Sequence, residues 1–252
     1  MMAETVPRSL ADWMWPFFSC FTASNWKHVL VLVTGRLCEM DVGILRRFDE
    51  ADRVTHSDLF FDSMSVGLGA AVLAGRNRDR ERVAAIPLVR SFYRDHLVYA
   101  GALARRIAHT ATGRATFDLE AEVDGDTHYY RNVIDVIVKN TRVYGGEWVL
   151  ASAAEHDDGL FEMVPICGLG DLTTKALATL RTSPIGEAHL AQLGFVSTRP
   201  VPGRSFVLTV MAPGAAAAPA CQLDGEEFHA GDRFGVEVLP RILRVRVPRP
   251  PG

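Results

Sequence analysis

One segment constrains the fold of this chain more than any other. Along residues 117–123, apolar Phe, Leu, Ala and Val alternate with acidic Asp and Glu. A period of two residues is typical of a β-strand that buries one face and exposes the other. Asp124-Gly125 follows, which is typical of a tight turn, and Thr127–Tyr130 continues as a second strand. The sequence therefore predicts a β-hairpin over residues 117–130.

Further strands are expected on both sides of this hairpin. They share short runs of β-branched and aromatic residues and are Val29–Val33, Val133–Val138, Phe206–Met211, Phe234–Val238 and Leu243–Val247. The run at 133–138 is apolar at nearly every position, as in a strand that is covered on both faces. Pro240 lies between the last two runs and predicts that they are separate strands.

Helices are expected at fewer places. Pro87–His109 carries an apolar face, Asp171 is suited to cap a helix through Leu180, and Pro184 is suited to open another through Leu193. Residues 76–82 interleave arginines with acids, which favours a solvated loop, with a membrane-surface contact as the alternative. The balance predicts a β-rich α+β protein, a β-sandwich with a helical insertion.

Composition excludes several classes of protein. With 48% hydrophobic and 23% charged residues, the chain has enough apolar side chains for a core, and no apolar run is long enough to span a bilayer. A net charge of −3 gives no reason to expect a nucleic-acid partner. The four cysteines are widely scattered, which favours reduced thiols and a cytoplasmic location.

Two acidic clusters are the candidate functional sites. Glu155–Gly159 and Asp224–Glu227 each follow an apolar segment. Taken alone, each is most typical of a turn, because Asp-Gly favours turns. Carboxylates in loops at strand ends can also bind Mg²⁺ or act as a general base. The residues alone leave both interpretations open.

The two clusters belong to one ordered set of motifs. Asn140–Gly146 with Ala153–Phe161, then Gln222–Glu226, then Val238–Val245, resembles the signature of the diacylglycerol kinase-type lipid kinases. That family includes bacterial lipid kinases and the sphingosine and ceramide kinases. Gly35–Gly43 and Phe61–Ala70 are similar to the start of the same lobe, so the resemblance covers about residues 30–248.

The resemblance implies a domain organisation and a set of site residues. Residues 29–252 would form the C-terminal β-sandwich lobe of a lipid kinase, and the aromatic-rich residues 1–28 would be a remnant of the nucleotide-binding lobe or a replacement for it. Glu226 would be the proton acceptor with Asp224 beside it. Asp158, with backbone oxygens of Glu155 and Leu160, would bind Mg²⁺.

The implied activity is the transfer of the γ-phosphate of ATP to a lipid hydroxyl at a membrane surface. The family's Gly-Gly-Asp-Gly-Thr nucleotide loop does not occur in the sequence. The kinase is therefore expected to be incomplete on its own, with a nucleotide-binding lobe supplied by a partner or within a homo-oligomer. The alternative is a non-catalytic lipid-binding or scaffolding module derived from such a kinase. Either would be cytoplasmic, with a peripheral membrane contact as an open expectation.

Overall fold

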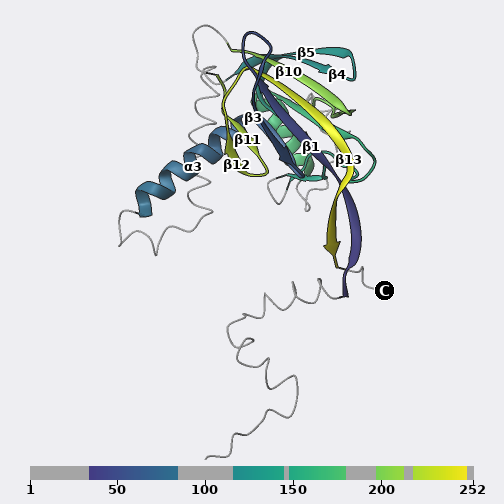
Figure 1. The fold of residues 1–252 in the computed structure, drawn as a ribbon. Coiled ribbons are helices and arrows are strands. Elements are labelled where there is room, and N and C mark those ends of the chain that lie inside the picture. The colour runs from purple at the N-terminus through teal and green to yellow at the C-terminus, as the bar shows by residue number, and fades with distance from the viewer. Residues whose placement is uncertain (1–33, 85–115, 145–147, 180–196, 213–217, 249–252) are drawn as a thin grey trace, which may run out of the picture. The chain divides into compact units, whose positions relative to one another are not determined.

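The computed structural model describes residues 34–84, 116–144, 148–179, 197–212 and 218–248 (Figure 1). The strands there are β1 (Arg36–Phe48), β2 (Val54–Phe60), β3 (Ser63–Gly67), β4 (Phe117–Val123), β5 (Asp126–Lys139), β6 (Val143–Tyr144), β7 (Trp148–Val149), β8 (Phe161–Cys167), β9 (Val201–Gly203), β10 (Ser205–Met211), β11 (Cys221–Leu223), β12 (Glu226–Phe228) and β13 (Arg233–Val247). The helices are α3 (Leu68–Ala84) and α5 (Gly168–Thr179). Residues 1–28, the expected strand at Val29–Val33 and the expected helices at Pro87–His109 and Pro184–Leu193 lie outside the described residues.

The chain divides into two compact units. The larger is residues 40–242, and the smaller joins residues 1–39 to residues 243–252. In the described part of the smaller unit, Arg244 Nε lies 3.3 Å from Glu39 Oε1, and Arg246 Nη1 donates to Gly35 O at 3.4 Å. The larger unit contains every candidate site residue.

Eleven of the strands form one sheet, in the order β12-β11-β3-β5-β4-β10-β13-β1-β2, with β8 pairing with β5 and β9. β5 organises the middle of this sheet, because its first half pairs with β4 and its second half pairs with β3 and β8. Asn132, between the two halves, has a left-handed φ of 55°. One long strand thus links β4 to β3 and β8.

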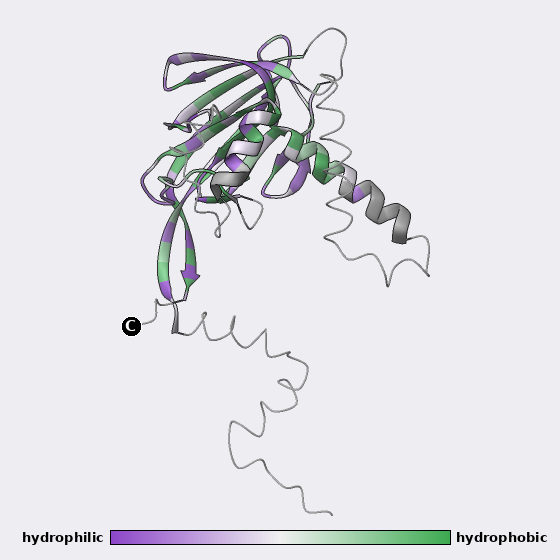
Figure 2. Ribbon diagram, turned by 180° about the vertical axis from the view of Figure 1, so that it is seen from behind, coloured by the Kyte–Doolittle hydropathy of each residue, from purple (hydrophilic) through white to green (hydrophobic). Residues whose placement is uncertain are grey.

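The main core lies inside a curl of this sheet. Hydrophilic and hydrophobic residues alternate along several strands, as Figure 2 shows, and β4 and β10 each bury one apolar face. The rings of Phe60 on β2 and Phe161 on β8 meet edge to face, with centroids 5.5 Å apart. These two strands are not neighbours in the sheet. The contact between them therefore closes the sheet over its own core.

The two helices cover the other face of β5. Ile134 and Ile137 on β5 pack with Leu68 of α3 and Leu172 of α5 in a second buried cluster. Val133, Val136 and Val138 face the main core instead. The prediction that residues 133–138 form a strand covered on both faces is confirmed. The prediction of a β-rich α+β fold is confirmed as well.

The predicted hairpin at residues 117–130 is confirmed. Residues 117–123 form β4 with their apolar side chains buried, and β4 pairs with the start of β5. Asp124 and Gly125 have φ values of 51° and 95°. Left-handed values at both turn residues match the right-handed twist of the two strands, and Asp and Gly tolerate them.

The prediction that Pro240 separates two strands is wrong. β13 runs without a break from Arg233 to Val247. A proline has no N–H to donate to a neighbouring strand, which usually ends the pairing. Here Arg241 takes a left-handed φ of 54°, and its N–H donates to the carboxylate of Asp41 at 2.7 Å. The Asp41 carboxylate thus satisfies the N–H of the residue after the proline, and the strand continues.

The prediction of a loop at residues 76–82 is also wrong, because these residues lie in α3. α3 begins directly after β3 and buries residues 70–73. Arg, Glu and Ala are good helix formers, so the charged run continues the helix once tertiary packing has started it. Neither described helix is long and apolar enough to cross a membrane.

Candidate active site

The Asp224 turn joins β11 to β12, which lie at one end of the sheet order. Asp224 and Gly225 have φ values of 47° and 84°, so this is a two-residue hairpin of the same kind as the turn at Asp124-Gly125. The predicted turn between two strands is therefore confirmed. Its first residue carries the carboxylate that the sequence singled out.

Both carboxylate oxygens of Asp224 accept hydrogen bonds from the backbone. Its Oδ2 accepts from the N–H of Phe61, and its Oδ1 accepts from the N–H groups of Asp62 and Ser63, each at 2.9 Å. Asp224 N also donates to Ser63 O at 2.8 Å. Hydrogen bonds to a charged acceptor are stronger than neutral ones. Asp224 therefore fixes the turn onto the corner between β2 and β3.

The two residues that follow the turn differ in their contacts. Glu227 Oε1 accepts from Asn77 Nδ2 of α3 at 2.8 Å. Glu226 is exposed, and within the described residues no hydrogen bond or ion pair engages its carboxylate. Glu226 is thus an available carboxylate on a fixed turn. A general base needs this combination, because it must reach a hydroxyl and have an oxygen free to accept the proton.

A shallow cavity of about 400 Å³ lies beside β12. It is lined by residues of β2 and by β12 with the residue after it, namely His56, Ser57, Asp58, Glu227, Phe228 and His229. The rings of His56 and His229 stack with centroids 3.5 Å apart. Burial, the charge of His229 and then that of Arg47 lower the pKa of His56. The cavity provides polar space next to the strand that carries Glu226.

The second acidic cluster forms another fixed turn. Asp158 Oδ1 accepts from Leu160 N at 2.9 Å, and Gly159 N donates to Asp41 Oδ2 at 2.7 Å. Asp41 is fully buried, and its other carboxylate oxygen accepts from Arg241 N at 2.7 Å. The buried Asp41 carboxylate on β1 therefore holds the Asp158 turn in place through the N–H of Gly159.

Carboxylate and backbone oxygens are the ligands that a hard cation such as Mg²⁺ prefers, and Asp158 is one carboxylate of this turn. Glu162 Oε2 is buried and has no hydrogen-bond partner. Burial and then the charge of Asp158 raise the pKa of Glu162 to about 7, so a cation between the two carboxylates would relieve unfavourable charge. The described residues contain no group of three His, Cys, Asp or Glu side chains suited to a metal. The predicted set uses one side chain, Asp158, with backbone oxygens of Glu155 and Leu160, and it stays a prediction.

Asn140 is hydrogen-bonded to the two segments that hold the turns. Its side-chain amide donates to Phe61 O at 3.2 Å, in the corner held by Asp224, and to Asp41 O at 2.9 Å, in the strand that holds the other turn. Asn140 is fully buried. The motifs at residues 140–146, 153–161 and 222–226 are therefore not independent, because one side chain connects their supports.

Lys139, the preceding residue, interacts with the charges of Asp62 and Glu162. It is fully buried, and its Nζ donates to Val143 O at 2.9 Å. Burial lowers its pKa to about 8, while the charges of Asp62 and Glu162 act in the opposite direction. Sequence reasoning missed Lys139, since a lysine at the end of an apolar strand gives no sign that it will be buried.

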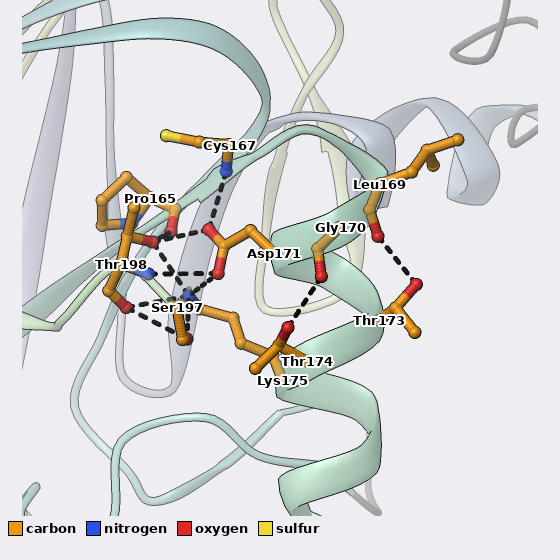
Figure 3. A network of polar contacts seen from close by, with 10 residues as sticks. All are labelled: Pro165, Cys167, Leu169, Gly170, Asp171, Thr173, Thr174, Lys175, Ser197 and Thr198. Atoms are coloured by element: carbon orange, nitrogen blue, oxygen red, sulfur yellow. Dashed lines mark hydrogen bonds and ion pairs between the residues drawn. The ribbon is translucent and has the colours of Figure 1, made fainter. Parts of the chain in front are cut away.

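A third polar cluster is structural (Figure 3). Asp171 and Lys175 form a buried ion pair on α5, with Nζ and Oδ1 2.6 Å apart. Thr198 Oγ1 donates to Asp171 Oδ2 at 2.6 Å, and Cys167 N donates to the same oxygen at 2.8 Å. The prediction that Asp171 caps the start of a helix is wrong in its position, because α5 begins three residues earlier, at Gly168, and the Asp171 carboxylate instead accepts from the N–H that precedes the helix. Its carboxylate is fully occupied, so the cluster fastens α5 and offers no free acid for chemistry.

No family model matches the chain, and no protein with a curated function matches it. Among solved structures, two proposed diacylglycerol kinases from Bacillus anthracis str. Sterne are 13% and 16% identical to it, each with a TM-score of 0.49, over 85% of this chain and 58% of theirs. Yeast NADH kinase complexed with NADH is 10% identical with a TM-score of 0.42, over 86% of this chain and 46% of that chain. The chain thus spans about half to three-fifths of the length of these proteins.

Proposed function

We propose that this chain provides the acceptor side of a lipid kinase, which transfers the γ-phosphate of ATP to a lipid hydroxyl. One observation carries the proposal: the Asp224 carboxylate is occupied by three backbone N–H groups, while Glu226 stays exposed on the turn that Asp224 fixes. The ordered lipid-kinase motifs support it, because the structure links their supports through Asn140.

Glu226 is assigned as the general base. A lipid hydroxyl is a weak nucleophile, so Glu226 accepts its proton as the hydroxyl oxygen attacks the γ-phosphorus. The new oxygen–phosphorus bond forms as the bond from the γ-phosphorus to the bridging oxygen breaks, and ADP leaves. A positioned base contributes roughly 10²–10⁴-fold to such a step. Positioning and charge stabilisation of the phosphoryl group supply most of the remainder.

Asp224 is assigned a positioning role in place of a chemical one. Its two oxygens already accept three hydrogen bonds, so it is poorly suited to take a further proton. Asp158, with backbone oxygens of Glu155 and Leu160, would hold Mg²⁺ in the neighbouring turn. Mg²⁺ bound there would supply positive charge among these carboxylates.

ATP is expected to bind to residues other than those described. The sequence has no Gly-Gly-Asp-Gly-Thr loop, and phosphoryl transfer depends on a phosphate-binding cradle. A nucleotide-binding lobe, in a partner or in a homo-oligomer, would meet the acceptor side at a membrane surface. Because the substrate is a lipid, we propose that the protein is cytoplasmic and contacts a membrane surface peripherally.

Calorimetric titration with two ligands tests the proposal. The purified chain is titrated with Mg-ATP and, in parallel, with a short-chain diacylglycerol. We expect saturable binding of the lipid and no detectable binding of Mg-ATP until a nucleotide-binding lobe is added. If the added lobe then gives no phosphorylated lipid, the chain is a non-catalytic lipid-binding module. Absence of lipid binding would contradict both interpretations.

A further inference from the structure

Gln222 lies directly behind the Asp224 turn. It is the central residue of β11 and is only 3% exposed. Its Oε1 accepts from Gly225 N at 2.7 Å, and its Nε2 donates to Ser65 Oγ at 3.2 Å. A buried carboxamide needs partners for both ends, and both are present. Gln222 therefore connects the turn to the interior of the sheet.

The contact between Gln222 and Ser65 is itself supported from behind. Ser65 is fully buried on β3, and its Oγ also accepts from Tyr144 Oη at 3.3 Å. A Cβ at Gly69 would lie only 2.5 Å from that Tyr144 hydroxyl. Glycine at position 69 thus allows the hydroxyl to reach Ser65. The support behind the turn extends through β3 to β6 and the first turn of α3.

The turn at Asp124-Gly125 lacks this support. The residue two positions before Asp124 is Glu122, which is exposed on β4. In the part of the chain that the structure describes, no side chain accepts from Gly125 N. The two turns have the same backbone form and the same anchoring carboxylate. Only the turn that precedes Glu226 is also held from inside.

We propose that Gln222 is a positioning residue, which, backed by Ser65 and Tyr144, fixes the Gly225 peptide and thereby the direction of Glu226. Asp224 holds the turn against the β2–β3 corner, and Gln222 holds the following peptide against β3. Two anchors on successive peptides leave the base little freedom to turn away from the acceptor. The part that concerns catalysis rests on the proposed function, since it requires Glu226 to be the base.

Two substitutions separate this role from simple filling of space. Gln222→Met keeps the shape and apolar character suited to a buried site but removes the acceptor for Gly225 N. Gln222→Glu keeps an acceptor oxygen but is less suited to burial. A positioning role requires Glu to preserve the turn better than Met does. A purely packing role requires the reverse order, because Met fits a core better.

Amide hydrogen exchange measures directly how firmly the N–H of Gly225 is held. In Gln222→Met, we expect the amide of Gly225 to exchange roughly five- to tenfold faster, as expected for the loss of one hydrogen bond. Gln222→Glu should stay close to the wild-type rate, and Ser65→Ala should fall between the two. Exchange in residues 122–128 should be unchanged in all three. Equal exchange at Gly225 in the wild type and Gln222→Met would overturn the proposal, as would equal loss in Met and Glu.

Phosphoryl transfer provides the second readout. With a nucleotide-binding lobe and short-chain diacylglycerol, Gln222→Met should lower kcat more than Gln222→Glu does, with little change in the KM for lipid. Equal kcat values in the two variants would contradict a role in catalysis. If the wild type transfers no phosphate, the proposed function fails while the exchange rates still decide whether Gln222 holds the turn.

Discussion

Two Asp-Gly turns in this protein have nearly the same backbone and differ in what they carry. Asp124-Gly125 has φ values of 51° and 95°, and Asp224-Gly225 has values of 47° and 84°. Each aspartate accepts backbone N–H groups from a neighbouring segment, at 2.8–3.1 Å for Asp124 and 2.9 Å for Asp224. The turn and its anchoring carboxylate are therefore a folding device that the chain uses twice.

The differences lie in the residues around the two turns. Asp224-Gly225 is followed by Glu226 and Glu227, has a cavity beside its second strand and is held from inside by Gln222. Asp124-Gly125 is followed by Asp126, which is exposed at the start of β5. An acidic turn of this kind is therefore a candidate site when available carboxylates follow it and interior side chains support it.

The largest effect is expected from removal of the anchoring carboxylates. Asp224→Ala leaves three backbone N–H groups without their charged acceptor and should lower the unfolding free energy by about 2–4 kcal/mol. Asp124→Ala, at a more exposed turn, should cost about 1–2 kcal/mol. Urea unfolding of both variants measures the difference. Equal losses would show that the Asp224 turn is no more firmly held than its counterpart.

The next effect is a pH dependence of the unfolding free energy, which we expect from the buried Asp135. Asp135 lies under the start of α3, where its Oδ2 accepts from Gly69 N at 2.8 Å, and burial raises its pKa from 3.8 to about 8. Between these values the folded chain holds a proton that the unfolded chain releases. The stability from this group is therefore complete below about pH 4 and is lost as pH rises to about 8.

Asp135→Asn removes this titration and tests it. The unfolding free energy of the wild type should fall relative to the variant by about 1 kcal/mol for each pH unit within that window. Urea unfolding at pH 6, 7 and 8 measures the slope. Parallel curves for the wild type and Asp135→Asn would contradict burial of a neutral carboxyl group.

Smaller and equal effects are expected at the two glycines. Both have left-handed φ values, and a Cβ would meet no atom within 4 Å at either position. The cost of Gly125→Ala and Gly225→Ala is therefore conformational and should be about 1–2 kcal/mol in each. Thermal unfolding compares them. A much larger loss at Gly225 would mean that this turn is strained in a way that the other is not.

The smallest effects on stability are expected at the exposed acids. Glu226→Gln and Asp126→Asn should each change the unfolding free energy by less than about 0.5 kcal/mol, because both side chains are exposed. Urea unfolding checks this. A substantial loss in Glu226→Gln would identify a structural role for that carboxylate and weaken its assignment as a base.

Sequence patterns predicted the local features of this fold well. The period of residues 117–123 and the Asp-Gly pairs fixed β4 and both hairpins, because each depends on a few consecutive residues. α3 was missed because its charged half is helical only in continuation of the packed residues 70–73. Pro240 was misjudged because the N–H of the next residue, Arg241, finds its acceptor in Asp41, 200 positions away.

The candidate site could be predicted only in part. Resemblance to lipid kinases pointed to Asp224, Glu226 and the Asp158 turn, which are consecutive motifs in the chain. The roles of Gln222, Lys139 and Asp41 depend on contacts between distant segments, such as Gln222 with Ser65, 157 positions apart. No single-sequence pattern reports such contacts, so the supports of a site are harder to predict than its acids.

Phosphorylation of a short-chain diacylglycerol by the chain, with Mg-ATP and an added nucleotide-binding lobe, tests the central claim most directly. Wild type and Asp126→Asn should transfer phosphate at equal rates, and Glu226→Gln should be slower by roughly 10²-fold or more at unchanged stability. That result would show that the acid after Asp224-Gly225 takes part in the reaction, whereas the acid after Asp124-Gly125 does not. Equal rates in Glu226→Gln and the wild type would contradict the assignment of Glu226 as the base.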